Sequence, residues 1–107
     1  MLKSRISLPK QASAGDIITV KTLVSHPMET GFRRNALGDP IPRNILRDFI
    51  CLYNNQQVFR AEFHPAVAAN PFLSFNVLVD VSGTFSFQWR EQSGVLTTVT
   101  RELTVTP

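Results

Sequence analysis

The strongest constraint in this sequence is the alternation of apolar and polar residues along most of its segments. Between residues 84 and 90, the aromatic residues Phe85, Phe87 and Trp89 alternate with polar ones. A period of two is typical of a β-strand with one buried and one exposed face. No segment shows a sustained helical period, since the short apolar run 66–69 lies between two prolines. We therefore expect an all-β fold whose core is built from the apolar face of each strand.

Turn signals separate the alternating segments. Asn54-Asn55 joins two of them, and both residues tolerate the positive φ that a two-residue hairpin requires. About seven short strands with such turns in about 100 residues are typical of an immunoglobulin-like antiparallel β-sandwich. The Cys…Trp…Cys signature of antibody domains is absent, so the prediction concerns the architecture alone. The predicted strands lie near residues 5–8, 16–24, 47–53, 57–63, 72–79, 84–90 and 95–105.

Length and composition fit one domain spanning residues 1–107. Of the 107 residues, 43% are hydrophobic and 18% are charged, which allows a real core and argues against disorder. A single cysteine excludes an internal disulfide. No apolar run approaches the roughly 18 residues of a membrane span, and the N-terminal segment has no apolar signal-peptide region. We therefore expect neither a membrane anchor nor a leader segment.

Charge gives no sign of a nucleic-acid partner. The net charge of +3 comes from basic residues that are spread along the chain. A nucleic-acid-binding protein normally concentrates them on one element and interleaves them with aromatic residues. The nearest approach to a cluster is Arg33, Arg34, Arg43 and Arg47, which we interpret as a solvated loop.

Two His-Pro segments mark the loops that we expect to be functional. The segment from Ser25 to Gly31 opens a loop of about fifteen to twenty residues, against a usual median of roughly 4–6. The second segment, His64 to Pro71, is apolar and either lies exposed or folds back over the end of the sandwich. Long loops on a small domain are commonly functional, and exposed apolar loops commonly mark protein interfaces. We predict partner contacts at His26, Met28, Arg33, Arg34, His64, Asn70 and Phe72.

Residues suited to catalysis or metal binding are few. Cys51 lies in phase with Phe49 and Tyr53, so we interpret it as a small buried core residue and not as a reactive thiol. The chain's two histidines, His26 and His64, lie far from Cys51 and from each other in sequence, whereas a structural zinc needs four protein ligands. We therefore expect no metal, no cofactor and no catalytic residue, and the chain is not predicted to be an enzyme.

Two other classes of function are alternatives. The string His26-Pro27-Met28 resembles part of the iron-binding segment of superoxide reductases, which are also immunoglobulin-like domains. That family's iron takes four histidines and one cysteine, whereas this chain has two histidines in total. This difference excludes an intact iron site of that kind. A mononuclear metal redox protein is still kept as the alternative function, and elemental analysis of the purified protein separates it from the non-catalytic subunit described below. A sugar- or peptide-binding module would use exposed aromatic residues, but Trp89 is in phase with the core.

Six segments, in this order and spanning nearly the whole chain, match the pattern of one protein family. They are Ile6-Ser-Leu-Pro-Lys10, Val20-Lys-Thr-Leu-Val-Ser-His-Pro-Met-Glu-Thr-Gly31, Gly38-Asp-Pro-Ile-Pro-Arg43, Phe49-Ile-Cys-Leu-Tyr-Asn54, His64-Pro-Ala-Val-Ala-Ala-Asn-Pro-Phe-Leu-Ser-Phe75 and Gly83-Thr-Phe-Ser-Phe-Gln-Trp89. The two His-Pro motifs, at this separation, are the most specific part of the likeness. On these segments the chain resembles the SoxZ family of the bacterial sulfur-oxidation (Sox) system.

The resemblance implies a non-catalytic subunit of a sulfur carrier. SoxZ proteins form a tight heterodimer with SoxY, another immunoglobulin-like domain, whose C-terminal Gly-Gly-Cys-Gly-Gly segment carries sulfur intermediates of thiosulfate oxidation as covalent adducts. The pair presents these adducts to the Sox enzymes in the periplasm, and SoxZ is exported together with SoxY. This chain ends Leu103-Thr-Val-Thr-Pro107 without a glycine-flanked cysteine, so we expect it not to be the carrier half. Without SoxY, an exposed mating surface would favour a homodimer.

Overall fold

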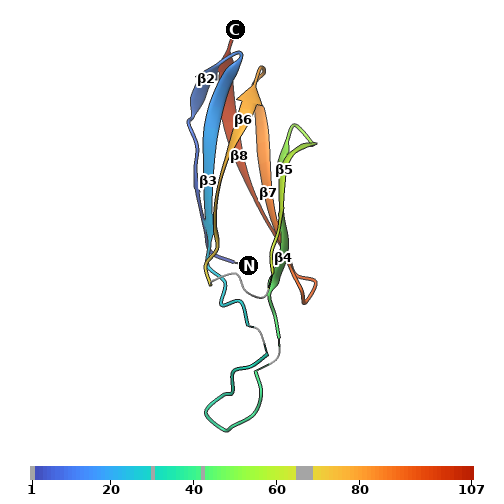
Figure 1. Ribbon diagram of the computed structural model, residues 1–107. Coiled ribbons are helices and arrows are strands. Elements are labelled where there is room, and N and C mark those ends of the chain that lie inside the picture. The colour runs from blue at the N-terminus through green and yellow to red at the C-terminus, as the bar shows by residue number, and fades with distance from the viewer. Residues whose placement is uncertain (1, 30, 42, 65–68) are drawn as a thin grey trace.

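Strands in two sheets build the fold, which is shown in Figure 1. The computed structural model describes residues 2–29, 31–41, 43–64 and 69–107. The strands are β1 (Ser4–Ser7), β2 (Gln11–Ser13), β3 (Asp16–Val24), β4 (Leu46–Tyr53), β5 (Gln56–Glu62), β6 (Phe72–Val79), β7 (Gly83–Glu91) and β8 (Leu96–Thr106). One sheet has the order β1-β3-β6 and the other the order β2-β8-β7-β4-β5. The prediction of an all-β, immunoglobulin-like sandwich is confirmed.

Each of the seven predicted strands is present, with bounds that differ by at most one residue. The additional strand is β2, which pairs in parallel with β8 and places Gln11 opposite Thr104. Its three residues are too few to show an alternation, so the sequence carried no signal for it. None of the described residues forms a helix long and apolar enough to cross a membrane.

Aromatic side chains from both sheets form the centre of the core. Phe49 and Phe87 are fully buried, and Trp89 is 1% exposed, as the alternation predicts. The ring of Phe49 lies 5.1 Å from that of Trp89 in the same sheet and 6.0 Å from that of Phe75 in the other sheet. Phe59 stacks on Phe75 with ring centroids 4.2 Å apart. The two sheets are therefore joined by direct aromatic contacts, which contribute beyond their buried area.

The hairpin between β4 and β5 has the predicted turn. Asn54 and Asn55 have φ values of 49° and 66°, in the left-handed region that asparagine tolerates better than most residues. The Asn54 side chain also accepts a hydrogen bond from the backbone N–H of Thr84 at 3.0 Å. A Cβ at Gly83 would overlap that asparagine amide, so a larger residue there would displace the Asn54 side chain from its hydrogen bond with Thr84.

The connection between β3 and β4, residues 25–45, extends from one end of the sandwich (Figure 1). We call it the 25–45 loop. Backbone hydrogen bonds join its two sides: the N–H of Glu29 donates to Asn44 O at 2.9 Å, and the N–H of Ile41 donates to Arg33 O at 2.9 Å. With this extension the molecule measures 60 × 20 × 19 Å along its principal axes. The loop is therefore a narrow, internally bonded projection from the sandwich.

Candidate partner-binding site

The 25–45 loop begins inside the sandwich and not on its surface. Every second residue of β3 from Ile18 to Val24 is buried, and the same alternation continues past the strand. It places His26 and Met28 inside, with 1% and 5% of their surfaces exposed. We expected both residues on a contact surface. The structure corrects this placement, because the extended backbone keeps the phase of β3 beyond the last strand residue.

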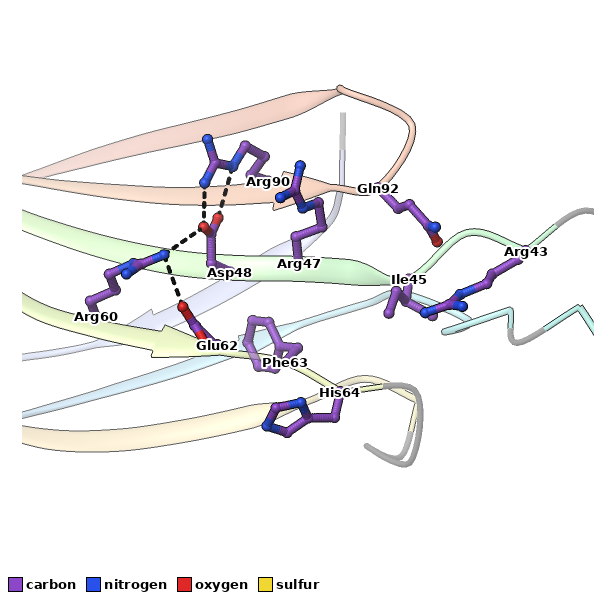
Figure 2. A pocket seen from close by; sticks show the side chains of 10 residues that line it. All are labelled: Arg43, Ile45, Arg47, Asp48, Arg60, Glu62, Phe63, His64, Arg90 and Gln92. Atoms are coloured by element: carbon purple, nitrogen blue, oxygen red, sulfur yellow. Dashed lines mark hydrogen bonds and ion pairs between the residues drawn. The ribbon is translucent and has the colours of Figure 1, made fainter.

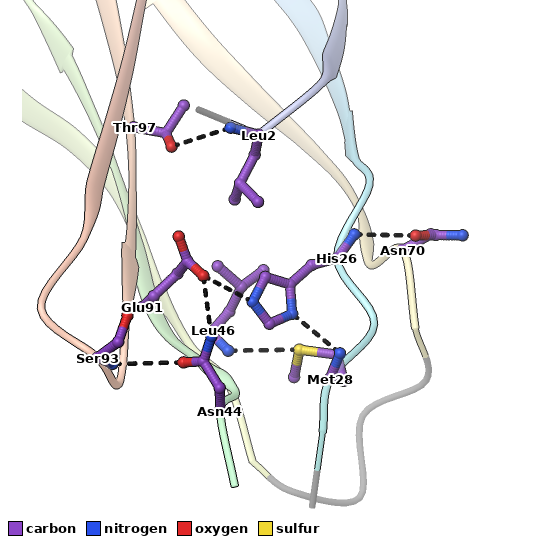
Figure 3. A network of polar contacts seen from close by, with 9 residues as sticks. All are labelled: Leu2, His26, Met28, Asn44, Leu46, Asn70, Glu91, Ser93 and Thr97. Atoms are coloured by element: carbon purple, nitrogen blue, oxygen red, sulfur yellow. Dashed lines mark hydrogen bonds and ion pairs between the residues drawn. The ribbon is translucent and has the colours of Figure 1, made fainter. Parts of the chain in front are cut away.

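His26 is the centre of a buried polar network, drawn in Figure 3. Its Nδ1 accepts a hydrogen bond from the backbone N–H of Met28 at 2.9 Å, so Nε2 carries the ring proton. That Nε2–H donates to Glu91 Oε1 at 3.0 Å, and Asn44 Nδ2 donates to the same oxygen at 3.2 Å. The network joins both ends of the 25–45 loop to the end of β7.

Glu91 was missed by sequence reasoning, although the sequence contains a signal for it. It follows Phe85, Phe87 and Trp89 at the next inward position of β7 and is 8% exposed. A carboxylate in phase with three aromatic core residues needs a hydrogen-bonding partner, because an unpaired buried charge is costly. His26 is that partner.

The two loops with His-Pro motifs meet at this end of the sandwich. Asn70 Oδ1 accepts a hydrogen bond from the backbone N–H of His26 at 2.9 Å, and the N–H of Asn70 donates to His26 O at 2.9 Å. Asn70 has a φ of 56°, and Phe72 next to it is 58% exposed. Whether the apolar segment caps the sandwich concerns mainly residues 65–68, which lie outside the described residues. Contact of Asn70 and Phe72 with a partner stays a prediction.

Arg33 and Arg34 are exposed, but both bind within the 25–45 loop. Arg33 Nε donates to Glu29 Oε2 at 3.0 Å, and this guanidinium holds the pKa of Glu29 below its ordinary value. Arg34 Nη1 donates to the backbone O of Gly38 at 2.8 Å. The two arginines therefore stabilise the loop. Their contact with a partner stays a prediction.

Two large apolar side chains lie on the outside of the same loop. Phe32 is 92% exposed and Leu37 is 87% exposed, the highest fractions among the large hydrophobic residues described. Neither belongs to an alternating segment, so sequence reasoning did not single them out. Exposed aromatic and aliphatic groups on a projection commonly mark a protein interface. We call Phe32 and Leu37 the loop apolar pair.

His64 is exposed and lies beside a polar pocket of about 400 Å³ on the outer face of β4, β5 and β7 (Figure 2). At this pocket Asp48, which is 4% exposed, accepts hydrogen bonds from two arginines. Arg90 Nε donates to Asp48 Oδ1 at 3.0 Å, and Arg60 Nη2 donates to Asp48 Oδ2 at 3.3 Å. Arg60 also pairs with Glu62 at 3.2 Å. The pocket is thus organised around one buried carboxylate.

The stability of the protein should fall in acid partly because Asp48 becomes protonated. Its hydrogen bonds with Arg90, and then with Arg60, hold its pKa below the ordinary value. A depressed folded-state pKa gives a contribution that is present above the unfolded value of about 3.9 and is lost as pH falls through the folded value. Urea unfolding at pH 6 and at pH 3 should therefore show a smaller acid loss in Asp48→Asn than in the wild type. Asp80→Asn, a matched change at an exposed aspartate, should keep the wild-type acid loss; equal losses in all three proteins would contradict the assignment.

The structure gives Cys51 a core position. Its side chain is fully buried, and burial raises its pKa to about 12, so the thiol stays protonated near neutral pH. Trp89, the only tryptophan of the chain, is also buried, so it does not offer the exposed indole face that the sugar- or peptide-binding alternative would use. Within the described ranges, no three His, Cys, Asp or Glu side chains are grouped as a metal site. His26 has both ring nitrogens engaged by protein groups.

Comparison with known proteins gives one family and a set of similar folds. A family model described as sulphur oxidation protein SoxZ matches residues 6–101. No curated protein sequence matches the chain.

Superoxide reductase (neelaredoxin) from Ignicoccus hospitalis is 21% identical, with a TM-score of 0.73 over 95% of this chain and 79% of that one. The sulfur carrier protein SoxY from Chlorobium limicola f thiosulfatophilum is 16% identical, with a TM-score of 0.70 over 97% and 79%. A putative superoxide reductase from Thermotoga maritima is 17% identical, with a TM-score of 0.75 over 97% and 86%. At these identities the structural likeness shows the fold alone.

Proposed function

Because this chain belongs to the SoxZ family of sulphur oxidation proteins, we propose that it is the non-catalytic subunit of a sulfur-carrier complex. The match of the family model over residues 6–101 carries this proposal. In the complex, the chain binds and stabilises a SoxY-type subunit whose cysteine holds the sulfur intermediates. It helps to present that cysteine to the enzymes of thiosulfate oxidation. The complex acts in the periplasm, to which the chain is exported together with its partner.

The fold and the chemistry of the described residues support a complex in which the partner carries the sulfur and this chain does not. SoxY from Chlorobium limicola has a similar fold, so the complex would join two like domains. Cys51, the one cysteine of the chain, is buried within the core and has a raised pKa. A protonated thiol without access to solvent is a poor nucleophile, so the sulfur is carried on the partner.

We place the partner contact on the 25–45 loop. The loop apolar pair presents Phe32 and Leu37 to solvent, and exposed charged groups such as Arg33 lie beside them. An apolar centre with a polar rim is the usual composition of a protein–protein interface. The loop is internally bonded, so binding it costs less ordering than binding a flexible segment would.

Replacing the loop apolar pair should weaken the complex. We expect Phe32→Ser or Leu37→Ser to raise the Kd for the SoxY-type subunit by about thirtyfold, the effect of losing roughly 2 kcal/mol at an interface hot spot. Thermal unfolding of the chain alone should be nearly unchanged, because both side chains are exposed in it. The affinity is measured by titration calorimetry with the purified partner.

The matched control is Val81→Ser. Val81 is a 61% exposed apolar residue in the connection between β6 and β7. That connection lies at the opposite end of the sandwich from the 25–45 loop (Figure 1). The substitution should leave the Kd unchanged within a factor of two or so. If Val81→Ser weakens the complex as much as Phe32→Ser does, the partner contact lies elsewhere.

Native mass spectrometry of the chain, purified with a C-terminal tag from its own cells, tests the proposed function itself. A one-to-one complex with a protein that ends in a glycine-flanked cysteine, with added sulfur mass on that cysteine, is the expected result. A lone chain that retains stoichiometric iron or copper would overturn the proposal in favour of a metal redox protein.

A further inference from the structure

A β-bulge in β4 places two neighbouring polar residues on one face. Where β4 pairs with β7, Leu46 lies opposite Glu91 and Asp48 lies opposite Arg90, so Arg47 is an extra residue. Without the bulge, Arg47 and Asp48 would point to opposite faces of the sheet. With it, both line the pocket on the outer face. Bulges often re-aim side chains next to functional sites.

The ion pairs around Asp48 fix two guanidinium groups at this pocket. Figure 2 shows Arg60, Asp48 and Arg90 in a row across β5, β4 and β7, joined by the contacts that the carboxylate accepts. The Asp48 side chain is 6% exposed, whereas those of Arg60 and Arg90 are 44% and 46% exposed. The Asp48 carboxylate is therefore occupied by contacts within the protein, whereas each arginine retains N–H donors that reach solvent.

The pocket has an excess of positive charge. Four arginines line it, Arg43, Arg47, Arg60 and Arg90, against the two carboxylates of Asp48 and Glu62, which leaves two positive charges in excess. Among the described residues, neither Arg43 nor Arg47 forms an ion pair with a carboxylate. The side chain of Arg43 runs from the 25–45 loop back toward Ile45 and the pocket (Figure 2).

We propose that this pocket binds a tetrahedral oxyanion; that this is a sulfur oxyanion of the sulfate or thiosulfate class rests on the proposed function. Guanidinium forks match the paired oxygens of such anions, and several forks around one cavity give directed, charge-assisted hydrogen bonds. The volume of about 400 Å³ falls within the usual range for small-ligand sites, roughly 300–1,000 Å³. Gln92 and His64 at the rim add further polar groups.

The same tetrahedral anionic group can come from two sources. It is either a free inorganic anion or a sulfonate group that a thiol of the partner subunit carries; this second source rests on the proposed function. In the second case the pocket would bind the sulfonate-bearing cysteine of the partner subunit. S-sulfocysteine, a small molecule with a sulfonate on a cysteine sulfur, represents the carried group.

An NMR titration of the ¹⁵N-labelled full chain tests the pocket directly. Sodium sulfate, sodium thiosulfate and S-sulfocysteine are added at an ionic strength held constant with sodium chloride. We expect saturable shifts of the signals of Arg47, His64 and Gln92. Tighter binding of S-sulfocysteine than of sulfate assigns the site to a carried group, and equal or tighter binding of the inorganic anions assigns it to a free anion.

Charge-removing variants localise the effect. Arg47→Gln should raise the apparent Kd about tenfold, and Arg43→Gln, in the loop and outside the strands, should act in the same direction without affecting the sheet. Arg101→Gln on β8 removes the same charge outside the pocket and should leave the Kd unchanged. Equal weakening by Arg101→Gln, or shifts no larger than those caused by chloride, would overturn the proposal. Binding of a polyglutamate peptide without any response to the sulfur anions would overturn it in favour of an acidic protein.

The anion-binding proposal and the proposed function can be disproved independently of each other. A chain that forms the complex with its partner but binds no anion disproves the pocket alone. A chain that binds the anions but forms no complex disproves the proposed function and leaves the pocket with a free anion as its ligand.

Discussion

Replacing Phe87 with alanine is expected to lower the free energy of unfolding by about 3–5 kcal/mol. Phe87 is fully buried in β7, and its ring lies 6.4 Å from that of Phe49 and 5.7 Å from that of Phe85, both in nearly parallel arrangements. Truncation removes the transfer energy of the ring and leaves a cavity that its rigid aromatic neighbours fill poorly. Urea unfolding followed by tryptophan fluorescence measures the change.

Phe32→Ala is the control for this prediction. It removes the same atoms from a side chain that is 92% exposed, so the free energy of unfolding should change by less than about 0.5 kcal/mol. A loss below about 1 kcal/mol in Phe87→Ala would mean that the ring does not fill the core as described.

His26→Ala should be the next most destabilising change, with an expected loss of about 2–4 kcal/mol. The substitution leaves the buried N–H of Met28 without its acceptor and removes the imidazole N–H that the Glu91 carboxylate accepts. Each buried group that loses its partner costs about 1–3 kcal/mol. The unfolding free energy in urea gives the magnitude.

The second histidine supplies a matched control. His64 is exposed, so His64→Ala should change the free energy of unfolding by less than about 0.5 kcal/mol. A double-mutant cycle of His26→Ala with Glu91→Gln should show a coupling of at least about 0.5 kcal/mol, because the two side chains are in direct contact. Additive effects would contradict the network.

The core was predictable because each inward residue is a local property of its strand. Phe85, Phe87 and Trp89 required only the period of two, and burial confirms all three. The same period, continued past Val24, places His26 and Met28 inside, but we interpreted the proline between them as the start of a loop and predicted both residues on its surface. The structure shows that the extended backbone continues past the loop signal, so the period was the better guide.

The candidate site was less predictable, because it depends on pairing between distant strands. His26 and Glu91 are 65 residues apart, and no local pattern connects them. The bulge at Arg47 exists only in the register of β4 against β7, and that register alone brings Arg47 and Asp48 to one face. The sequence did identify the two loops that meet at His26 and Asn70, since their unusual composition is local.

The order of the three-stranded sheet has a consequence for how the protein behaves when it is concentrated. β6 is the last strand of its sheet, and no described strand pairs with its outer side. Its eight residues, Phe72–Val79, include no charged side chain and no proline, the two features that most often prevent edge-to-edge pairing. Its free backbone N–H and C=O groups can therefore template strand addition by another chain. A preparation kept without a partner should be stored dilute, because β6 gives self-association a ready starting point.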